Sequence, residues 1–171
     1  MSPESPTPPT VAIALALIYS SAPDSALNTP TFLMQLRDDK PDILYPGHWG
    51  LFGGHLDPGE TPEICIHREL MEEIGHDIAD LQVFKVVQRQ HVLCTLYYGV
   101  LDVPTSELVL GEGMDLKLVS VEELQRGEAW SEAIAETRPM GDFHCGVLLE
   151  FWEALRQGGL AASTTAPPTV V

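Results

Sequence analysis

The chain has 171 residues, 44% of them hydrophobic and 20% charged, a composition typical of one globular domain with a hydrophobic core. Its 25 acidic and 9 basic residues give a formal net charge of -16 at pH 7. Such a surface repels nucleic acids and anionic membranes, so we expect neither as a partner. An acidic protein that binds a phosphorylated ligand needs a cation between the two, and a divalent metal is the obvious candidate.

Cysteine use and the N-terminal region indicate a cytoplasmic protein. Cys65, Cys94 and Cys145 are too few and too widely spaced for a disulfide framework or a CxxC-type zinc site, so reduced thiols are expected. The apolar run Val11–Tyr19 is too short to span a bilayer, and residues 1–10 before it contain no Lys or Arg. We therefore expect neither a membrane span nor an export signal.

The first half of the chain predicts a series of strands. Residues 1–10 are rich in Pro and Ser and are expected to form a flexible tail. An apolar run predicts a strand over Val11–Ser20, and a second follows at Thr31–Asp38 after a loop. A third strand, interrupted by glycines, is expected over Trp49–Leu56, and Asp57-Pro58-Gly59 forms a turn after it.

A helix is predicted to follow this turn. Thr61 is a good N-cap, Pro62 suits the first helical position, and Glu63 suits the positive end of the helix dipole. Gly75 is typical of a residue that ends a helix. The sequence therefore predicts a helix from Thr61 to Ile74.

The second half adds further strands and helices. Strands are expected over Leu81–Gln90, His91–Val103 and Asp115–Ser120, and helices over Val121–Gln125 and Gly141–Arg156. Residues 158–171 are small and uncharged and form a second expected tail, which leaves residues 11–157 as the domain. Interleaved strands and helices indicate an α+β fold, an α/β/α sandwich with a mixed β-sheet.

Three glutamates gather on one side of the predicted helix. At about 100° per residue, Glu69, Glu72 and Glu73 lie at i, i+3 and i+4. They are turned away from the centre of an expected buried stripe of Leu70, Met71 and Ile74. Like charges this close repel by about a few tenths of a kcal/mol per pair. Either they form a solvated acidic face, or their oxygens bind a hard cation such as Mg²⁺ or Mn²⁺.

The residues around these glutamates resemble the Nudix box, the signature of the Nudix hydrolase family. The matching pattern is Gly54-x5-Glu60-x7-Arg68-Glu69-Leu70-x-Glu72-Glu73-x-Gly75. The next position departs from the family pattern, because His76 stands where an apolar residue is usual. The resemblance implies a Nudix-type α/β/α sandwich.

The resemblance also implies roles for these residues. Glu69, Glu72 and Glu73 match the metal ligands of the family, and the carbonyl of the residue matching Gly53 often joins them. Glu60 and Arg68 match an ion pair that positions the helix and its ligands. An ordinary surface ion pair is the alternative for Arg68.

The activity that the resemblance implies is metal-dependent hydrolysis of a diphosphate bond in a nucleoside diphosphate linked to another moiety. Water attacks phosphorus, and Mg²⁺, with Mn²⁺ as a substitute, is the expected cofactor. The general base comes either from the box, as Glu73 or Glu69, or from a downstream loop. Glu112 stands in that loop between Gly111 and Gly113, where we expect it to swing towards the site or to be a solvated turn acid.

Two further residues are candidates for substrate binding. Arg37 follows the second strand, like a basic residue in relatives, and either binds phosphate or holds the loop. His55 comes directly after Gly54. The six histidines show no zinc-binding spacing, so no zinc site is assigned.

Other functions remain as alternatives. A Nudix module that binds a nucleotide or nucleotide-sugar without cleaving it is one, although this chain retains all the box carboxylates. An isomerase of the same family would need catalytic motifs that do not surround Cys65 or Cys94. The partner is a small nucleotide diphosphate derivative: dinucleoside polyphosphates, sugar nucleotides and damaged nucleoside triphosphates all stay open. Many relatives form homodimers.

Overall fold

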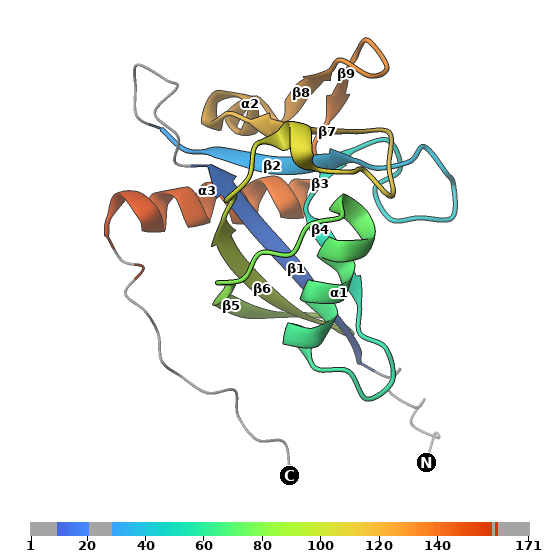
Figure 1. The fold of residues 1–171 in the computed structure, drawn as a ribbon, viewed down its shortest axis with the longest axis vertical. Helices are drawn as coiled ribbons and strands as arrows, with labels where there is room; N and C mark the ends of the chain where they lie inside the picture. Colours follow the sequence, from blue (N-terminus) through green and yellow to red (C-terminus); the bar gives the residue numbers. More distant parts are fainter. Residues whose placement is uncertain (1–9, 21–28, 159, 161–171) are drawn as a thin grey trace, which may run out of the picture.

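A computed structural model describes residues 10–20, 29–158 and 160 of the chain. Its centre is a mixed seven-stranded sheet, with one main helix against each face (Figure 1). The elements are β1 (Val11–Ser20), β2 (Thr31–Leu36), β3 (Trp49–Gly50), β4 (Phe52–His55), α1 (Pro62–Ile74), β5 (Gln82–Arg89), β6 (Val92–Val100), η1 (Thr105–Glu107), β7 (Asp115–Val119), α2 (Val121–Arg126), β8 (Glu128–Ser131), β9 (Glu136–Pro139) and α3 (Asp142–Arg156).

Strand β1 organises the sheet because it pairs with three other strands. Along one edge it runs parallel to β6, from Val11↔Val92 to Tyr19↔Val100. Along the other edge its first half pairs antiparallel with β4, and its last three residues pair antiparallel with β2. Strands β2 and β4 therefore share one edge of β1, and β4 lies next to α1 (Figure 1).

Successive side chains of β1 point to opposite faces of the sheet and contribute to two separate hydrophobic cores. Leu15 and Leu17 point to the face covered by α3, where Phe151 is fully buried. Ala14, Ala16 and Ile18 point to the face covered by α1. The small residues of β1 on this second face allow α1 to pack closely, which brings its side chains near β4.

The predicted α/β/α sandwich with a mixed β-sheet is confirmed. The strand expected over Trp49–Leu56 is divided into β3 and β4. The hairpin of β8 and β9 was not predicted, because the inward residues of β8 are the small Ala129 and Ser131, which give no hydrophobic pattern. The short helix η1 was not predicted either. The expected tails lie almost entirely outside the described residues. No helix within the described ranges is long and apolar enough to cross a membrane.

The aromatic cluster under α3 generates a stability prediction. The Phe151 ring packs against one aromatic ring from each of four strands, at centroid distances of 5.2 to 6.3 Å: Tyr19, Phe32, Phe84 and Tyr98. We expect Phe151→Ala to lower the free energy of unfolding by about 3–5 kcal/mol, measured by chemical denaturation. Val86→Ala, at a side chain 56% exposed, should change it by less than about 0.5 kcal/mol.

Candidate active site

Helix α1 begins and ends where its capping residues fix it. The Thr61 hydroxyl accepts a hydrogen bond from the Ile64 N–H at 3.2 Å, and Pro62 is the first helical residue. Gly75 ends the helix in the left-handed conformation at φ 64° and donates its N–H to the Met71 carbonyl. Both predicted boundaries are thus confirmed, and the carboxylates lie in the second half of the helix.

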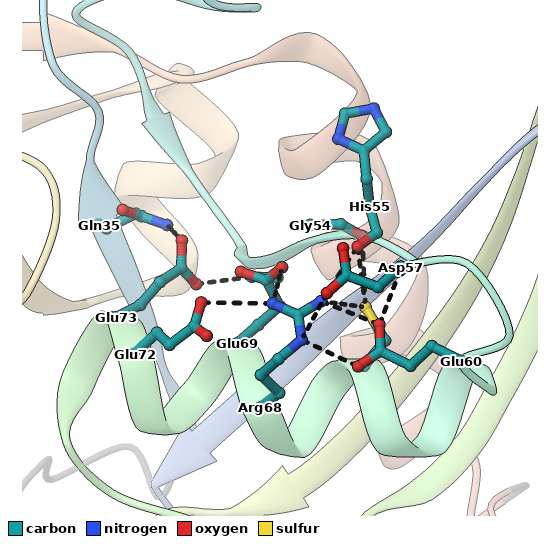
Figure 2. A network of polar contacts seen from close by, with 11 residues as sticks. Gln35, Gly54, His55, Asp57, Glu60, Arg68, Glu69, Glu72 and Glu73 are labelled. Atoms are coloured by element: carbon teal, nitrogen blue, oxygen red, sulfur yellow. Dashed lines mark hydrogen bonds and ion pairs between the residues drawn. The ribbon is translucent and has the colours of Figure 1, made fainter.

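Arg68 is the centre of a polar network along α1 (Figure 2). Its Nε and Nη2 donate to the two carboxylate oxygens of Glu60, each at 2.9 Å. Its Nη1 donates to Glu69 at 2.9 Å and to Glu72 at 3.3 Å. Nη2 also donates to the His55 carbonyl at 3.1 Å. The guanidinium therefore joins the turn before α1, the end of β4 and two box glutamates.

The two-pronged bond with Arg68 also sets the charge state of Glu60. Hydrogen bonds from Arg68, and then from the Asp57 N–H, lower the pKa of Glu60 to about 2. The Glu60 side chain is only 8% exposed, whereas an ordinary surface carboxylate is largely solvated. The predicted Glu60–Arg68 pair is thus present in a geometry that holds both groups charged.

Glu73 differs from the arrangement that the helical pattern predicted. It is 4% exposed and lies inside the fold, whereas Met71, expected in the buried stripe, is 53% exposed. The reason is that β2 and β4 pack over the Glu73 side of the helix. Gln35 Nε2 donates to one Glu73 oxygen at 2.8 Å (Figure 2). The Gly53 N–H donates to the other at 2.8 Å.

Burial also shifts the titration of the box glutamates. Loss of solvent raises the pKa of Glu73 to about 7, against the lowering effect of its hydrogen bonds from Gln35 and Gly53. Burial raises the pKa of Glu69 as well, and Arg68 opposes that rise. Glu72 is the exposed member of the three, with 57% of its side chain accessible.

The two glycines of β4 are required by close packing. Gly53 has φ +124°, and a Cβ there would lie 2.1 Å from the Ala14 carbonyl oxygen of β1. A Cβ on Gly54 would lie 2.5 Å from a carboxylate oxygen of Glu69. Glycine at these two positions therefore lets β4 pack closely against β1 and against the Glu69 carboxylate.

The loop that carries Glu112 is held against the end of α1. The Gly111 N–H donates to the Glu73 carbonyl at 2.7 Å, and the Val109 N–H donates to the Ile74 carbonyl at 2.9 Å. A Cβ on Gly111 would lie 2.1 Å from the Glu72 carbonyl oxygen. Gly111 thus allows the loop to pack tightly against the end of α1. Glu112 itself is exposed beside the site.

A cavity of about 340 Å³ lies next to Glu73. It brings together three predicted site residues from distant parts of the chain: Arg37, Glu73 and Glu112. Arg37 Nε donates to the Leu44 carbonyl at 2.9 Å, and no acceptor within the described part of the chain contacts its two terminal nitrogens. The remaining lining residues are Gln35, Asp38, Lys40, Ile43, Gly111 and Gly113.

Two observations were not predicted from the sequence. His55 contributes its backbone carbonyl to the Arg68 network, while its imidazole points away from the carboxylates (Figure 2). Gln35, which contacts Glu73, was missed because one polar residue in an apolar strand has no spacing signal. The one available signal was its place between Met34 and Leu36, because a polar residue inside an apolar strand is expected to be buried with its neighbours.

The donor chemistry of the site suits a hard divalent cation. Glu69, Glu72, Glu73 and Glu112 supply carboxylate oxygens, and Arg68 is the cation that the box glutamates contact in the network. Among the described residues, no three His, Cys, Asp or Glu side chains already surround a common metal position. Hydrogen bonds from Arg68, Gln35 and Gly53 hold the carboxylate oxygens in the present arrangement.

Comparison with known proteins agrees with this geometry. The family model of the NUDIX domain matches residues 22–137, and the chain belongs to the Nudix family. Members of this family are in general pyrophosphohydrolases that act on nucleotide-linked diphosphates and use divalent metal ions.

Individual relatives match over shorter stretches or at lower identity. The nucleoside triphosphatase NudI of Enterobacter sp. (strain 638) is 50% identical over 32 residues, which cover 19% of this chain and 23% of that protein. NudI of Escherichia coli O9:H4 (strain HS) is 39% identical over 46 residues, 27% of this chain and 31% of that protein. The match thus covers less than a third of either relative.

Solved structures show the same fold. A MutT protein from Methanosarcina mazei Go1 has a TM-score of 0.57 and 21% identity, covering 92% of this chain and 100% of that one. The NUDIX domain of Shewanella oneidensis NrtR, solved with ADP ribose, has a TM-score of 0.64 and 16% identity, covering 85% of this chain and 88% of that one.

The raised pKa of Glu73 predicts a pH effect on the metal-free protein. The pKa of Glu73 is about 7 in the folded protein, against the ordinary value of 4.5. Protonated Glu73 therefore stabilises the fold at low pH, and this stabilisation is lost as the pH rises through about 7. We expect Glu73→Gln to raise the melting temperature above pH 7 in EDTA, with a gain that shrinks towards pH 5.

Glu60 provides a control of opposite sign. Because its pKa is lowered from 4.5 to about 2, ionised Glu60 contributes fully to the free energy of unfolding above pH 4.5. This contribution is lost only as the pH falls towards about 2. Glu60→Gln should therefore lower the melting temperature by a similar amount at pH 5 and at pH 8. A Glu73→Gln effect that is equally independent of pH would contradict the assignment of the titration to Glu73.

Proposed function

We propose that this protein is a metal-dependent pyrophosphohydrolase that cleaves a diphosphate bond in a nucleoside diphosphate linked to another moiety. The observation that carries the proposal is the cavity beside Glu73. It combines a buried box carboxylate, the exposed Glu112 and the Arg37 guanidinium, whose terminal nitrogens contact no acceptor among the described residues. Such a combination of acidic and cationic groups suits a phosphate ester bound together with a divalent cation.

Glu69, Glu72, Glu73 and the Gly53 carbonyl are the proposed ligands of the cation, with Mg²⁺ as the cofactor and Mn²⁺ as a substitute. When bound, the ion neutralises the diphosphate and lowers the pKa of the attacking water. Glu60 and Arg68 hold the helix against the end of β4, and so keep the ligands beside Gly53 and Gly54. This is a positioning role, because Arg68 contacts the proposed ligands Glu69 and Glu72 and is not among the residues that line the cavity.

The remaining proposed roles belong to the cavity wall. Arg37 binds a phosphate oxygen through its terminal nitrogens, because its Nε is already used by the Leu44 carbonyl. Glu112 or Glu73 accepts the proton of the attacking water. The three cysteines are all free thiols, which supports a reducing, cytoplasmic compartment for this activity. His55 stays a candidate substrate contact at the end of β4.

One experiment tests the proposal directly. The protein is incubated with a panel of nucleoside triphosphates, nucleotide-sugars and dinucleoside polyphosphates, with Mg²⁺ or with EDTA, and released phosphate and nucleotide are identified. We expect turnover with Mg²⁺ and its loss in EDTA without unfolding, and Glu73→Gln should reduce kcat by at least about a hundredfold. Binding without cleavage would instead support a nucleotide-sensing module.

Glu112 and Glu72 should separate chemistry from metal binding. Glu112→Gln is expected to lower kcat about tenfold or more while the rise in melting temperature with Mg²⁺ stays as in the parent protein. Glu72→Gln should reduce both quantities, because a proposed ligand is lost. Unchanged kcat and KM in Glu112→Gln would assign the general base to the box, with Glu73 or Glu69 as the next candidates.

A further inference from the structure

Gln35 is a buried polar residue at the floor of the cavity. It lies in β2 between Met34 and Leu36, both fully buried in the hydrophobic core, and is itself only 2% exposed. Burying an amide without hydrogen-bond partners is unfavourable, and an apolar side chain would satisfy a strand interior at this position. The contacts of its amide group therefore indicate what Gln35 does.

The orientation of this amide is fixed by its neighbours. Nε2 donates to Glu73 Oε1 at 2.8 Å and lies 3.5 Å from the Leu51 carbonyl oxygen. A backbone carbonyl only accepts, and so does an ionised carboxylate, so the NH₂ end must face these two groups. Oε1 consequently lies on the opposite side, next to Gly113, where an added Cβ would be 3.3 Å away.

The oxygen of the amide is left without a donor. Over residues 10–20, 29–158 and 160, no N–H or O–H donates to Gln35 Oε1, although Gln35 lines the cavity. Glycine at position 113 keeps a side chain from covering this oxygen. An acceptor that faces a cavity without a protein donor is complementary to a hydrogen-bond donor on the molecule that fills it.

The charges around the cavity narrow the class of donor. Phosphate oxygens accept hydrogen bonds and are repelled by Gln35 Oε1 and by the Glu73 carboxylate. Arg37 and Lys40 lie in the cavity wall and suit phosphate better. A neutral donor attached to the phosphates, such as a sugar hydroxyl or a base N–H, is therefore the group that fits Gln35 best.

We propose that Gln35 selects substrates by accepting a hydrogen bond from a hydroxyl or N–H of the nucleoside, and that the same amide orients Glu73. The inference rests on the proposed function, since it names the substrate group that this site recognises. Both ends of one amide are used: the C=O for the substrate and the NH₂ for the carboxylate. A substrate that lacks the donor loses one hydrogen bond, which corresponds to about three- to tenfold in kcat/KM.

The test compares substrates that differ by one donor. GTP, 2′-deoxyGTP, which lacks a sugar hydroxyl, and ITP, which lacks the exocyclic amine, are assayed with Mg²⁺ for hydrolysis and for thermal stabilisation of the protein. The variants are Gln35→Met, which removes both ends of the amide, and Gln35→Glu, which keeps an acceptor oxygen. Gln82→Met is the matched control, because Gln82 lies on β5 and accepts from the Tyr98 hydroxyl outside the cavity.

We expect the parent protein and Gln82→Met to disfavour one of the two analogues by about three- to tenfold. Gln35→Met should reduce the ratio of kcat/KM for GTP to that for the disfavoured analogue to within about twofold, and it should also lower kcat. Gln35→Glu should retain the ratio but lower kcat, because its second oxygen replaces the donor to Glu73. The analogue that loses efficiency identifies the donor as the sugar hydroxyl or the base amine.

The outcomes separate this inference from the proposed function. An unchanged ratio in Gln35→Met, or no ratio in the parent protein, overturns the inference and leaves the hydrolase intact; a metal-bound water as the donor would give that result. The parent protein could instead cleave none of the three nucleotides but be thermally stabilised by them to different degrees. If this difference is lost in Gln35→Met, the proposed activity is overturned and the role of Gln35 is supported.

Discussion

A single buried carboxylate, Glu73, holds the parts of the candidate site together. Its two oxygens accept hydrogen bonds from β2 through Gln35 and from β4 through Gly53. Its backbone carbonyl accepts from Gly111 in the loop before β7. Strand, helix and loop therefore meet at one residue, and the position of each depends on the others. A carboxylate in this environment is costly unless a cation or a proton neutralises it, which links the packing of the fold to the chemistry of the site.

Much of this arrangement was predictable because local chemistry fixes it. The capping residues Thr61 and Gly75 determine where α1 begins and ends, and the box pattern identified Arg68 with its partner Glu60. Arg37 and Glu112 were each suggested by family resemblance, without any expectation that they lie close together. In the structure their proximity follows from pairing of β2 with β7, in which Leu36 faces Asp115.

The remaining features depend on tertiary packing, which periodicity does not contain. Helical spacing placed Glu73 beside an exposed face, but the burial of that face is decided by β2 and β4. Met71, which the same spacing placed in the buried stripe, is 53% exposed. Gln35 could not be recognised because its importance comes from a partner 38 residues away. The β8–β9 hairpin escaped prediction because its buried residues are small.

The division of the two cores between opposite faces of the sheet bears on how such a protein can evolve. The aromatic cluster around Phe151 lies under α3, whereas the carboxylates and their glycines lie on the α1 side. Mutations that improve packing under α3 can therefore accumulate without touching the carboxylates of α1. That reserve of stability allows the other face to keep mutually repelling acids and to vary residues of the cavity wall such as Ile43.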